Sequence, residues 1–256
     1  MGYYLAMNFH VLTLFPQIFN GTLPHSMIGR AIDNGIVSVT CTDIRDYSSD
    51  THGTADDYQY GGGPGMVMKP EPIFDAVDNI FKQIPLSDHK NTPIALLSPQ
   101  GKQLNQNIIN EFSKLNNLVL ICGHYAGVDE RVRDNLITEE ISIGDYVLTG
   151  GELAALVIID SVSRFVTGVI GSEDNVQNDS ITSGLLQHPL YTRPSEYRSY
   201  RVPEILRSGN HAEIDKWRRH ESLKRTLINR PDLLSSADLD EDDIRYLSEL
   251  GYQKSN

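Results

Sequence analysis

Short apolar runs that end in glycine-rich loops constrain the fold of this chain more than any other feature. The glycine-rich loops lie at residues 60–66, 98–101, 122–127 and 143–153. The later three follow or interrupt runs that are typical of buried strands. Because glycine permits positive φ and a close approach of the backbone to a ligand, several such loops at strand ends predict one pocket built largely from main chain. None has the spacing of a dinucleotide-binding motif or of a P-loop.

Strand and helix signals alternate through the first two thirds of the chain. Strands are expected at 8–15, 36–42, 93–97 and 118–122. Helices are expected at 22–34, 70–84, 104–115, 129–136 and 152–166. Residues 43–65 hold few apolar side chains and are expected to form a long loop. Alternation of this kind predicts an α/β domain with a mainly parallel sheet.

The expected helix 152–166 is apolar nearly all round. Such a helix needs cover on more than one side, so it lies either at the centre of the domain or in a dimer interface. The polar stretch 171–183 is typical of a linker, and helical signals follow it at 202–207, 210–229 and beyond 238. The chain is therefore predicted to hold an α/β domain over 1–169, a flexible linker over 170–183 and a small, mainly helical domain over 184–256.

The composition is typical of a globular protein without a membrane span. No apolar stretch in the 256 residues reaches the roughly 18 that a spanning helix needs. The N-terminus lacks the features of a signal peptide, and Met7 is a second candidate start, so residues 1–6 are expected to be dispensable. Cys41 and Cys122 lie in apolar runs, which favours buried free thiols and a reducing, cytoplasmic location over a disulfide or a metal site.

The net charge of −12 argues against nonspecific coating of nucleic acid. Residues 193–230 differ from the rest because they carry ten Lys or Arg and five Asp or Glu. A basic segment on an acidic chain indicates local contact with phosphate groups. On charge alone, an ordinary solvated helix face explains this segment equally well.

Longer motifs point to one family. They lie at 60–66, 97–101, 122–127 with 129–131, 142–153, 160–165, 188–194 and 208–214. In these stretches the chain resembles the bacterial tRNA (guanine-N1)-methyltransferases, the TrmD family of the SPOUT methyltransferases. The resemblance implies a trefoil knot in the α/β domain, an obligate homodimer and S-adenosylmethionine as methyl donor. It also implies methylation of the tRNA guanosine directly 3′ of the anticodon, in an active site formed across the dimer.

The family binds S-adenosylmethionine in a bent shape between three loops. The positions that the resemblance implies for cofactor contact are Leu96, Leu97, Ser98, Pro99, Gly101, Gly123, Tyr125, Gly127, Ile143, Gly144, Tyr146, Leu148, Gly150 and Gly151. Apolar walls with main-chain donors and acceptors suit an adenine ring. Each glycine alone is more typical of a turn, and the three loops together favour the cofactor.

Methylation of guanine N1 needs a base, because N1 carries a proton at neutral pH. A carboxylate against N1 removes that proton, and a cation near O6 stabilises the developing negative charge. Asp179 matches the catalytic aspartate of the family, and Arg164 matches an arginine expected to contact the guanine or the cofactor carboxylate. Without the resemblance, Asp179 before a serine favours a helix N-cap, and Arg164 is typical of a charge that extends from a core helix to solvent.

Basic side chains of the helical domain are expected to contact phosphates and so to position the RNA: Arg218, Arg219, Lys224 and Arg225. His211 is a further candidate for RNA contact, although Asn210 beside it is also a good helix cap. Trp217 has helical spacing from Ile214, which favours a core position over base stacking. Glu152 is expected to satisfy backbone amides at a helix N-terminus, and residues 129–131 to form a structural charge network.

The chain departs from the family at the cofactor loops. Ala126 stands where the family usually has a glutamate implicated in handling magnesium, so an implied Mg²⁺ requirement is in question and no residue is assigned as a metal ligand. His124 and Gly53 replace usual arginines, and Ala154 with Ala155 changes the helix entry mildly. We expect activity to survive with altered cofactor affinity or divalent-ion dependence.

Two alternative functions stay open from the sequence. One is a related knotted methyltransferase that acts on a ribose 2′-OH or on a ribosomal base, against which a base at Asp179 argues. The other is a catalytically weakened RNA-binding protein. Ala126 and the low overall basicity support this second alternative, whereas Asp179, Arg164 and the three intact loops argue against it.

Overall fold

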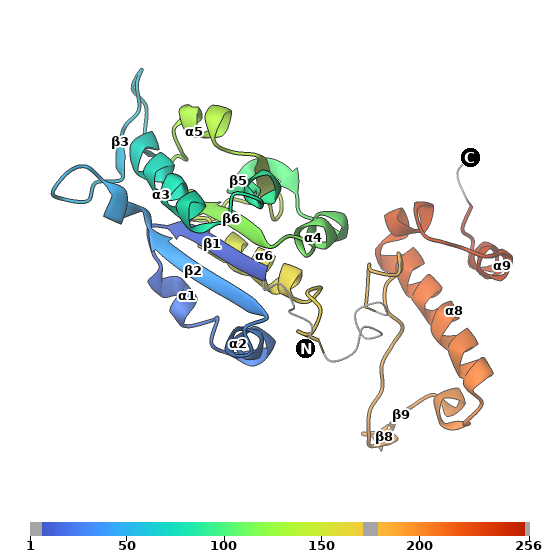
Figure 1. The fold of residues 1–256 in the computed structure, drawn as a ribbon. Helices are drawn as coiled ribbons and strands as arrows, with labels where there is room; N and C mark the ends of the chain where they lie inside the picture. Colours follow the sequence, from blue (N-terminus) through green and yellow to red (C-terminus); the bar gives the residue numbers. More distant parts are fainter. Residues whose placement is uncertain (1–6, 171–178, 254–256) are drawn as a thin grey trace. The chain divides into compact units, whose positions relative to one another are not determined.

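A computed structural model of the chain describes residues 7–170 and 179–253 (Figure 1). It contains two compact units, Met1–Gly171 and Ser172–Asn256, which are considered separately below. Residues 1–6, expected to be dispensable, and most of the expected linker lie outside the described residues. In the described part of the chain, no helix has the length and apolar character that crossing a membrane requires.

A parallel five-stranded sheet forms the centre of the first unit. Its strands are β1 (Met7–Thr13), β2 (Val37–Asp43), β5 (Ile94–Gln103), β6 (Asn117–Cys122) and β7 (Glu139–Ser142). Their order across the sheet is β2-β1-β6-β5-β7, and all four neighbouring pairs are parallel. The expected parallel sheet is confirmed. The sequence missed β7, because it is short and begins with two glutamates.

Helices cover both faces of this sheet (Figure 1). They are α1 (Gln17–Asn20), α2 (Ser26–Asp33), α3 (Pro70–Gln83), α4 (Gln106–Phe112), α5 (Glu130–Asn135) and α6 (Glu152–Ser163). Side chains alternate between faces along a strand, so in β6 Leu118 and Leu120 pack with α2, α4 and α6. Val119 and Ile121 pack on the opposite face with α3 and α5. Both faces of the central strands are therefore buried, as their continuous apolar sequence requires.

The expected long loop at 43–65 is partly ordered into secondary structure. It contains a 3₁₀-helix, η1 (Ile44–Tyr47), and the strand β3 (Asp56–Tyr58), which pairs antiparallel with β4 (Met66–Met68). The glycines between these strands have positive φ, which suits them to the hairpin tip. The loop expectation was wrong here because three-residue strands carry too little periodicity to be recognised from sequence.

The second unit is mainly helical, as expected. It contains β8 (Glu196–Tyr197), β9 (Tyr200–Arg201), η3 (Glu204–Arg207), α8 (His211–Asn229), η4 (Pro231–Ser235) and α9 (Glu241–Glu249). A small core of Leu185, Leu223, Leu234 and Leu247 holds α8, η4 and α9 together. The helix expected at 202–207 is a short 3₁₀-helix, and the sequence did not predict the β8–β9 pair.

Candidate functional site

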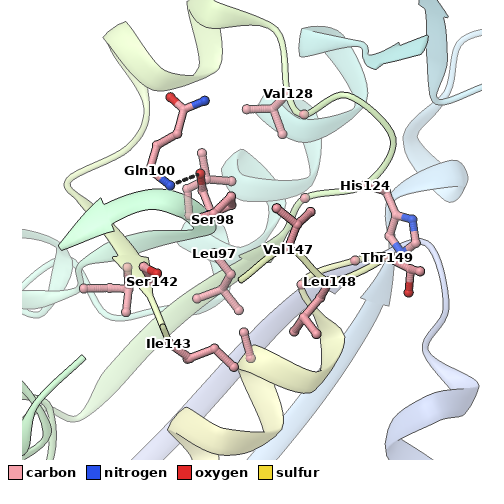
Figure 2. A pocket seen from close by; sticks show the side chains of 18 of the residues that line it. Leu97, Ser98, Gln100, His124, Val128, Ser142, Ile143, Val147, Leu148 and Thr149 are labelled. Carbon is pink, nitrogen blue, oxygen red and sulfur yellow. Dashed lines mark hydrogen bonds between the residues drawn. The ribbon is translucent and has the colours of Figure 1, made fainter. Parts of the chain in front are cut away.

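A pocket opens where β5, β6 and β7 meet the loops of the first unit (Figure 2). Loop 1 (98–101), loop 2 (123–127) and loop 3 (143–151) supply most of its lining. The pocket occupies about 830 Å³ when its open mouth is counted. Loop 1 is a bulge within β5, because Leu97 and Lys102 both align with Ile141 of β7. The bulge and the two strand-end loops thus converge on one cavity.

The pocket gathers nearly all the residues that the sequence associated with a cofactor. They are Leu96, Leu97, Ser98, Pro99, Gly123, Tyr125, Gly127, Ile143, Gly144, Tyr146, Leu148, Gly150 and Gly151. Ten further residues line the pocket that the sequence analysis did not assign to cofactor contact: Gln100, His124, Ala126, Val128, Arg133, Ile141, Ser142, Val147, Thr149 and Ala154. Five of these lie within the glycine-rich loops 98–101, 122–127 and 143–153, and four more lie within two residues of a loop. Treating each loop as a whole, extended by one or two residues, is the signal that finds all but Arg133.

Gly101 is absent from the pocket lining, although the resemblance implied a cofactor contact there. A Cβ atom built on Gly101 meets the carbonyl carbon of Glu140 and the amide nitrogen of Ile141, each at 2.4 Å. The backbone of β7 therefore passes too close to Gly101 for any side chain. The glycine serves strand packing at this position.

Loop 2 has an unusual backbone that β4 holds in place. Tyr125, an exposed aromatic residue, has a φ of 59°, a region that residues other than glycine rarely adopt. The amide of Ala126 donates to the carbonyl of Met66, and the amide of Met68 donates to the carbonyl of Gly127, both at 2.9 Å. Strain of this kind persists where surrounding contacts impose it and is frequent at binding sites. The loop is thus shaped by its neighbours before any ligand arrives.

Loops 2 and 3 are joined by a buried carboxylate. The Nε2 atom of His124 lies 3.1 Å from Oε2 of Glu152, and the Thr13 hydroxyl donates to Oε1 at 2.7 Å. Glu152 is buried, with 3% of its surface exposed. The main chain reinforces this link, because the amide of Gly151 donates to the carbonyl of Gly123 at 2.9 Å. Glu152 was expected to cap α6, and it instead accepts from two distant side chains.

Ion pairs balance the charge of the one arginine among the residues that line the pocket. Arg133, which lines the pocket, forms ion pairs with Glu140 at 3.2 Å and Glu130 at 3.4 Å.

Burial raises the pKa of the Cys41 thiol to about 11 and also raises the pKa of Cys122. Both cysteines are free, as expected, and both thiols stay protonated at neutral pH. Cys122 is buried and Cys41 only half-buried.

The expected charge network at 129–131 is present at the start of α5. Arg131 donates to both carboxylate oxygens of Asp129, at 2.8 and 2.9 Å. The side-chain hydrogen bond from Arg131 lowers the pKa of Asp129. Asp129 also accepts from the backbone amide of Arg131 and so caps the helix. These residues have a structural role here.

The two expected catalytic residues lie outside the pocket lining. Arg164 is the half-buried C-cap of α6 in the first unit. Asp179 is half-buried in the second unit and does not cap any helix in the described part of the chain. Arg164 belongs to the first unit and Asp179 to the second, and a joint catalytic role stays a prediction.

The expected RNA contacts separate into exposed and engaged side chains. Arg219 donates from Nε to both carboxylate oxygens of the buried Asp243, each at 3.1 Å, and this hydrogen bonding raises the pKa of Arg219. Arg218 pairs with Asp215 on the helix surface, and Arg225 donates to the carbonyl of Gln187. Lys224 and His211 are exposed.

The structure bears on the roles that the sequence left open for Asn210 and Trp217 of α8. Asn210 caps α8 by accepting from the Glu213 amide at 3.5 Å, as the cap reading expected. Trp217 is half-buried and lies beside Tyr191 and His188, with ring centroids 6.5 and 6.4 Å away. The indole is therefore a packing residue at the edge of its unit. Among the described residues, no group of three His, Cys, Asp or Glu side chains is placed to hold a metal ion.

Comparison with known proteins decides the family. The family described as tRNA (Guanine-1)-methyltransferase TrmD matches residues 7–236. The chain belongs to this family. It is 50% identical over 244 residues to the tRNA (guanine-N(1)-)-methyltransferase of Dehalococcoides mccartyi, covering 95% of this chain and 97% of the relative. The enzyme of the same name from Anoxybacillus flavithermus is 51% identical over 243 residues, covering 95% and 98% of the two chains.

A third relative, the tRNA (guanine-N(1)-)-methyltransferase of Staphylococcus epidermidis, is 49% identical over 237 residues, covering 93% of this chain and 94% of the relative. Coverage of this extent spans both compact units. The match therefore includes the pocket of the first unit and the helical second unit, and not one domain alone.

Proposed function

We propose that this protein is an S-adenosylmethionine-dependent tRNA (guanine-N1)-methyltransferase. Membership of the family and the names of its relatives support the enzyme class and the tRNA substrate. The observation that carries the proposal is the pocket, in which three loops expected to bind the methyl donor line a single cavity. Its apolar walls, backbone of positive φ and exposed tyrosines fit an adenine ring and a flexible amino-acid chain.

The proposed reaction is methylation of N1 of the guanosine that follows the anticodon. S-adenosylmethionine supplies an electrophilic methyl group, and the carbon–sulfur bond breaks as the nitrogen–carbon bond forms, leaving a neutral thioether. In this proposal the carboxylate of Asp179 takes the N1 proton, which makes N1 nucleophilic. Arg164 stabilises the negative charge that develops toward O6. No redox partner is needed.

A homodimer is part of this proposal, and exposed apolar side chains support it. On α6, Ala155 and Ile158 are buried in the core while Leu153 and Val157 are exposed. Phe15 and Ile18 are exposed on the neighbouring α1 region, which contacts α6. An apolar patch of this kind favours a protein interface. In the proposed dimer, Asp179 of one subunit completes a site around the cofactor of its partner.

Three further features follow from the family resemblance. We propose the trefoil knot for the region that carries loops 1, 2 and 3, and the cytoplasm as the location. We propose no protein-bound magnesium, because Ala126 offers no oxygen ligand where the family has a carboxylate. Magnesium that the tRNA itself needs is a separate requirement.

The test is methyl transfer from radiolabelled S-adenosylmethionine to two tRNA transcripts that differ only in guanosine or adenosine after the anticodon. Wild type is compared with Asp179→Ala and with Asp238→Ala, an exposed aspartate of the second unit that serves as a matched control. We expect methyl transfer only to the guanosine transcript. In Asp179→Ala the rate of transfer should fall by about a hundredfold or more, which is the order of a general base's contribution. Asp238→Ala should transfer at the wild-type rate.

Other outcomes separate the parts of the proposal. Equal transfer to both transcripts points to another target nucleotide. Full activity of Asp179→Ala removes this residue as the base while leaving the enzyme class intact. Binding of S-adenosylmethionine without transfer to either tRNA contradicts the proposed function and favours an RNA-binding protein.

A further inference from the structure

The second unit carries a short hairpin formed by β8 and β9 (Figure 1). Its side chains are exposed, and aromatic and basic residues are prominent among them. Every residue from 191 to 201 is exposed. Tyr197 and Tyr200 stand opposite each other across the hairpin, with 61% and 80% of their surfaces exposed. Buried tyrosines contribute to stability by packing, and these two do not pack into the core of their unit. Their rings are available to a partner.

The hairpin turn departs from the usual sequence rule. Arg198 and Ser199 occupy its two central positions with φ of 48° and 66°. Turns with two positive φ angles strongly favour Asn and Gly, because other side chains pay a steric cost there. The conformation places the Arg198 guanidinium carbon 5.3 Å from the centroid of the Tyr197 ring. A strained arginine at an exposed tip favours a binding role over a folding role.

Contacts within the segment hold the shape of this hairpin without a hydrophobic core. Arg201 donates from Nε to Glu196 at 2.9 Å, and the Val202 amide donates to the Ser195 carbonyl at 3.0 Å. At the base of the segment, Tyr191 packs beside Trp217 of α8. The platform is thus preorganised, which lowers the entropic cost of binding.

The charge of this surface selects an anionic partner. Residues 190–207 carry four arginines and two glutamates, on a chain whose net charge is −12. Flat aromatic faces beside guanidinium groups are the features that bind unpaired nucleotides, through base stacking and phosphate contact. An acidic protein partner needs no stacked rings, and a double helix offers no free base faces.

We propose that Tyr197, Arg198 and Tyr200 form a stacking platform for unpaired nucleotides of the RNA substrate. This inference rests on the proposed function and names a contact surface for it. The platform belongs to a different element from the basic residues of α8 that the sequence indicated, so it adds base contacts to phosphate contacts. Stacking tolerates any base, so the surface contributes affinity and orientation rather than a sequence code.

The test measures binding of an unmodified tRNA transcript to the full-length protein over a range of salt concentrations. The variants are Tyr197→Ala with Tyr200→Ala, the same pair changed to Phe, and Arg198→Ala. Arg245→Ala is the control, because Arg245 is 70% exposed and pairs only with Asp242 on the surface of α9 among the described contacts.

The two kinds of variant are expected to behave differently. Loss of each ring weakens binding by about fivefold or more, without changing the salt dependence, and the Phe pair restores affinity. The logarithm of the binding constant falls as the logarithm of the salt concentration rises. In Arg198→Ala this slope becomes less steep by about 0.7, as loss of one single-strand phosphate contact requires. Arg245→Ala binds as the wild type does. Binding of S-adenosylmethionine and the thermal midpoint stay at wild-type values in all variants.

The results that overturn the platform are specific. If the wild type is an active methyltransferase and the Tyr197→Ala, Tyr200→Ala double variant binds tRNA as tightly as the wild type does, the platform is contradicted. A change in molecular mass in solution, in place of a change in RNA affinity, assigns the surface to a contact between protein chains. An inactive wild type, by contrast, removes the proposed function itself.

Discussion

His124 and Glu152 lie 28 residues apart in the sequence and join two glycine-rich loops through a contact of 3.1 Å between Nε2 and Oε2. The ring of Phe15 lies 4.9 Å from the His124 ring. Because Glu152 is buried, its carboxylate depends on His124 and Thr13 for hydrogen bonds. The pair therefore fixes the distance between two walls of the pocket.

Removing the histidine is expected to weaken binding of S-adenosylmethionine. In His124→Ala the buried carboxylate loses one partner, which costs about 1–3 kcal/mol, or about fivefold to a hundredfold in affinity if the loops separate. His124→Arg supplies a donor again and is expected to retain most of the affinity. Calorimetric titration with the methyl donor measures both variants, and an unchanged dissociation constant in His124→Ala contradicts the role of the pair.

A methyl group at Gly151 is expected to abolish the pocket. A Cβ atom there meets the Cα atom of Cys122 at 2.7 Å, and this backbone contact has no room to relax. Gly151→Ala should bind the methyl donor about fivefold more weakly or worse, because overpacking costs about 1–3 kcal/mol. Gly21→Ala is the matched control, since nothing lies within 4 Å of its Cβ position. Wild-type binding by Gly151→Ala contradicts the observed packing of loop 3.

Restoring the family carboxylate is expected to introduce a magnesium effect. Ala126 lines the pocket, and Mg²⁺ prefers oxygen ligands that alanine does not offer. We expect binding of S-adenosylmethionine by the wild type to be the same with Mg²⁺ and with a chelator, and the Ala126→Glu variant to differ between the two. Titrations without RNA avoid the magnesium requirement of tRNA folding. A magnesium effect in the wild type contradicts this expectation.

The ion pair between Arg219 and Asp243 is expected to stabilise the second unit. Asp243 is buried, with 4% of its side chain exposed, whereas Arg219 is 38% exposed. Arg219→Ala leaves the carboxylate of Asp243 without its main partner. The free energy of unfolding should fall by about 1–3 kcal/mol, and the effect is not larger because solvent screens the exposed arginine. Arg218→Ala, at an exposed surface pair, should change it by about 0.5 kcal/mol or less. Urea unfolding measures both, and equal midpoints contradict the structural role.

Acid is expected to destabilise the first unit through His10. Burial lowers the pKa of His10, and the hydrogen bond with Asn117 only partly offsets this effect. The unfolded chain therefore binds more protons than the folded protein below the ordinary histidine pKa of about 6.5. As the pH falls from that value through the lowered pKa, the free energy of unfolding decreases. Urea midpoints should fall less in His10→Gln than in the wild type, and identical pH profiles exclude this contribution.

The sequence by itself determined the elements whose signals are local. The apolar runs that form β1, β5 and β6 define strands buried on both faces, and the period of α3 defines a helix, because these patterns need only nearby residues. The glycine-rich motifs likewise indicated most of the residues that line the pocket. These residues could be assigned because each motif that resembles the family is a short continuous stretch of sequence.

Only the tertiary structure decided which distant residues meet. Nothing local indicates that Glu152 turns to His124 and Thr13, or that Arg219 is held by Asp243, since each pairing depends on how loops and helices pack. Gly101 must be glycine because the backbone of β7 packs against it. This requirement cannot be predicted from the sequence without knowing where β7 lies. Local sequence sets the backbone preference of each segment, whereas burial and long-range hydrogen bonds choose its partners.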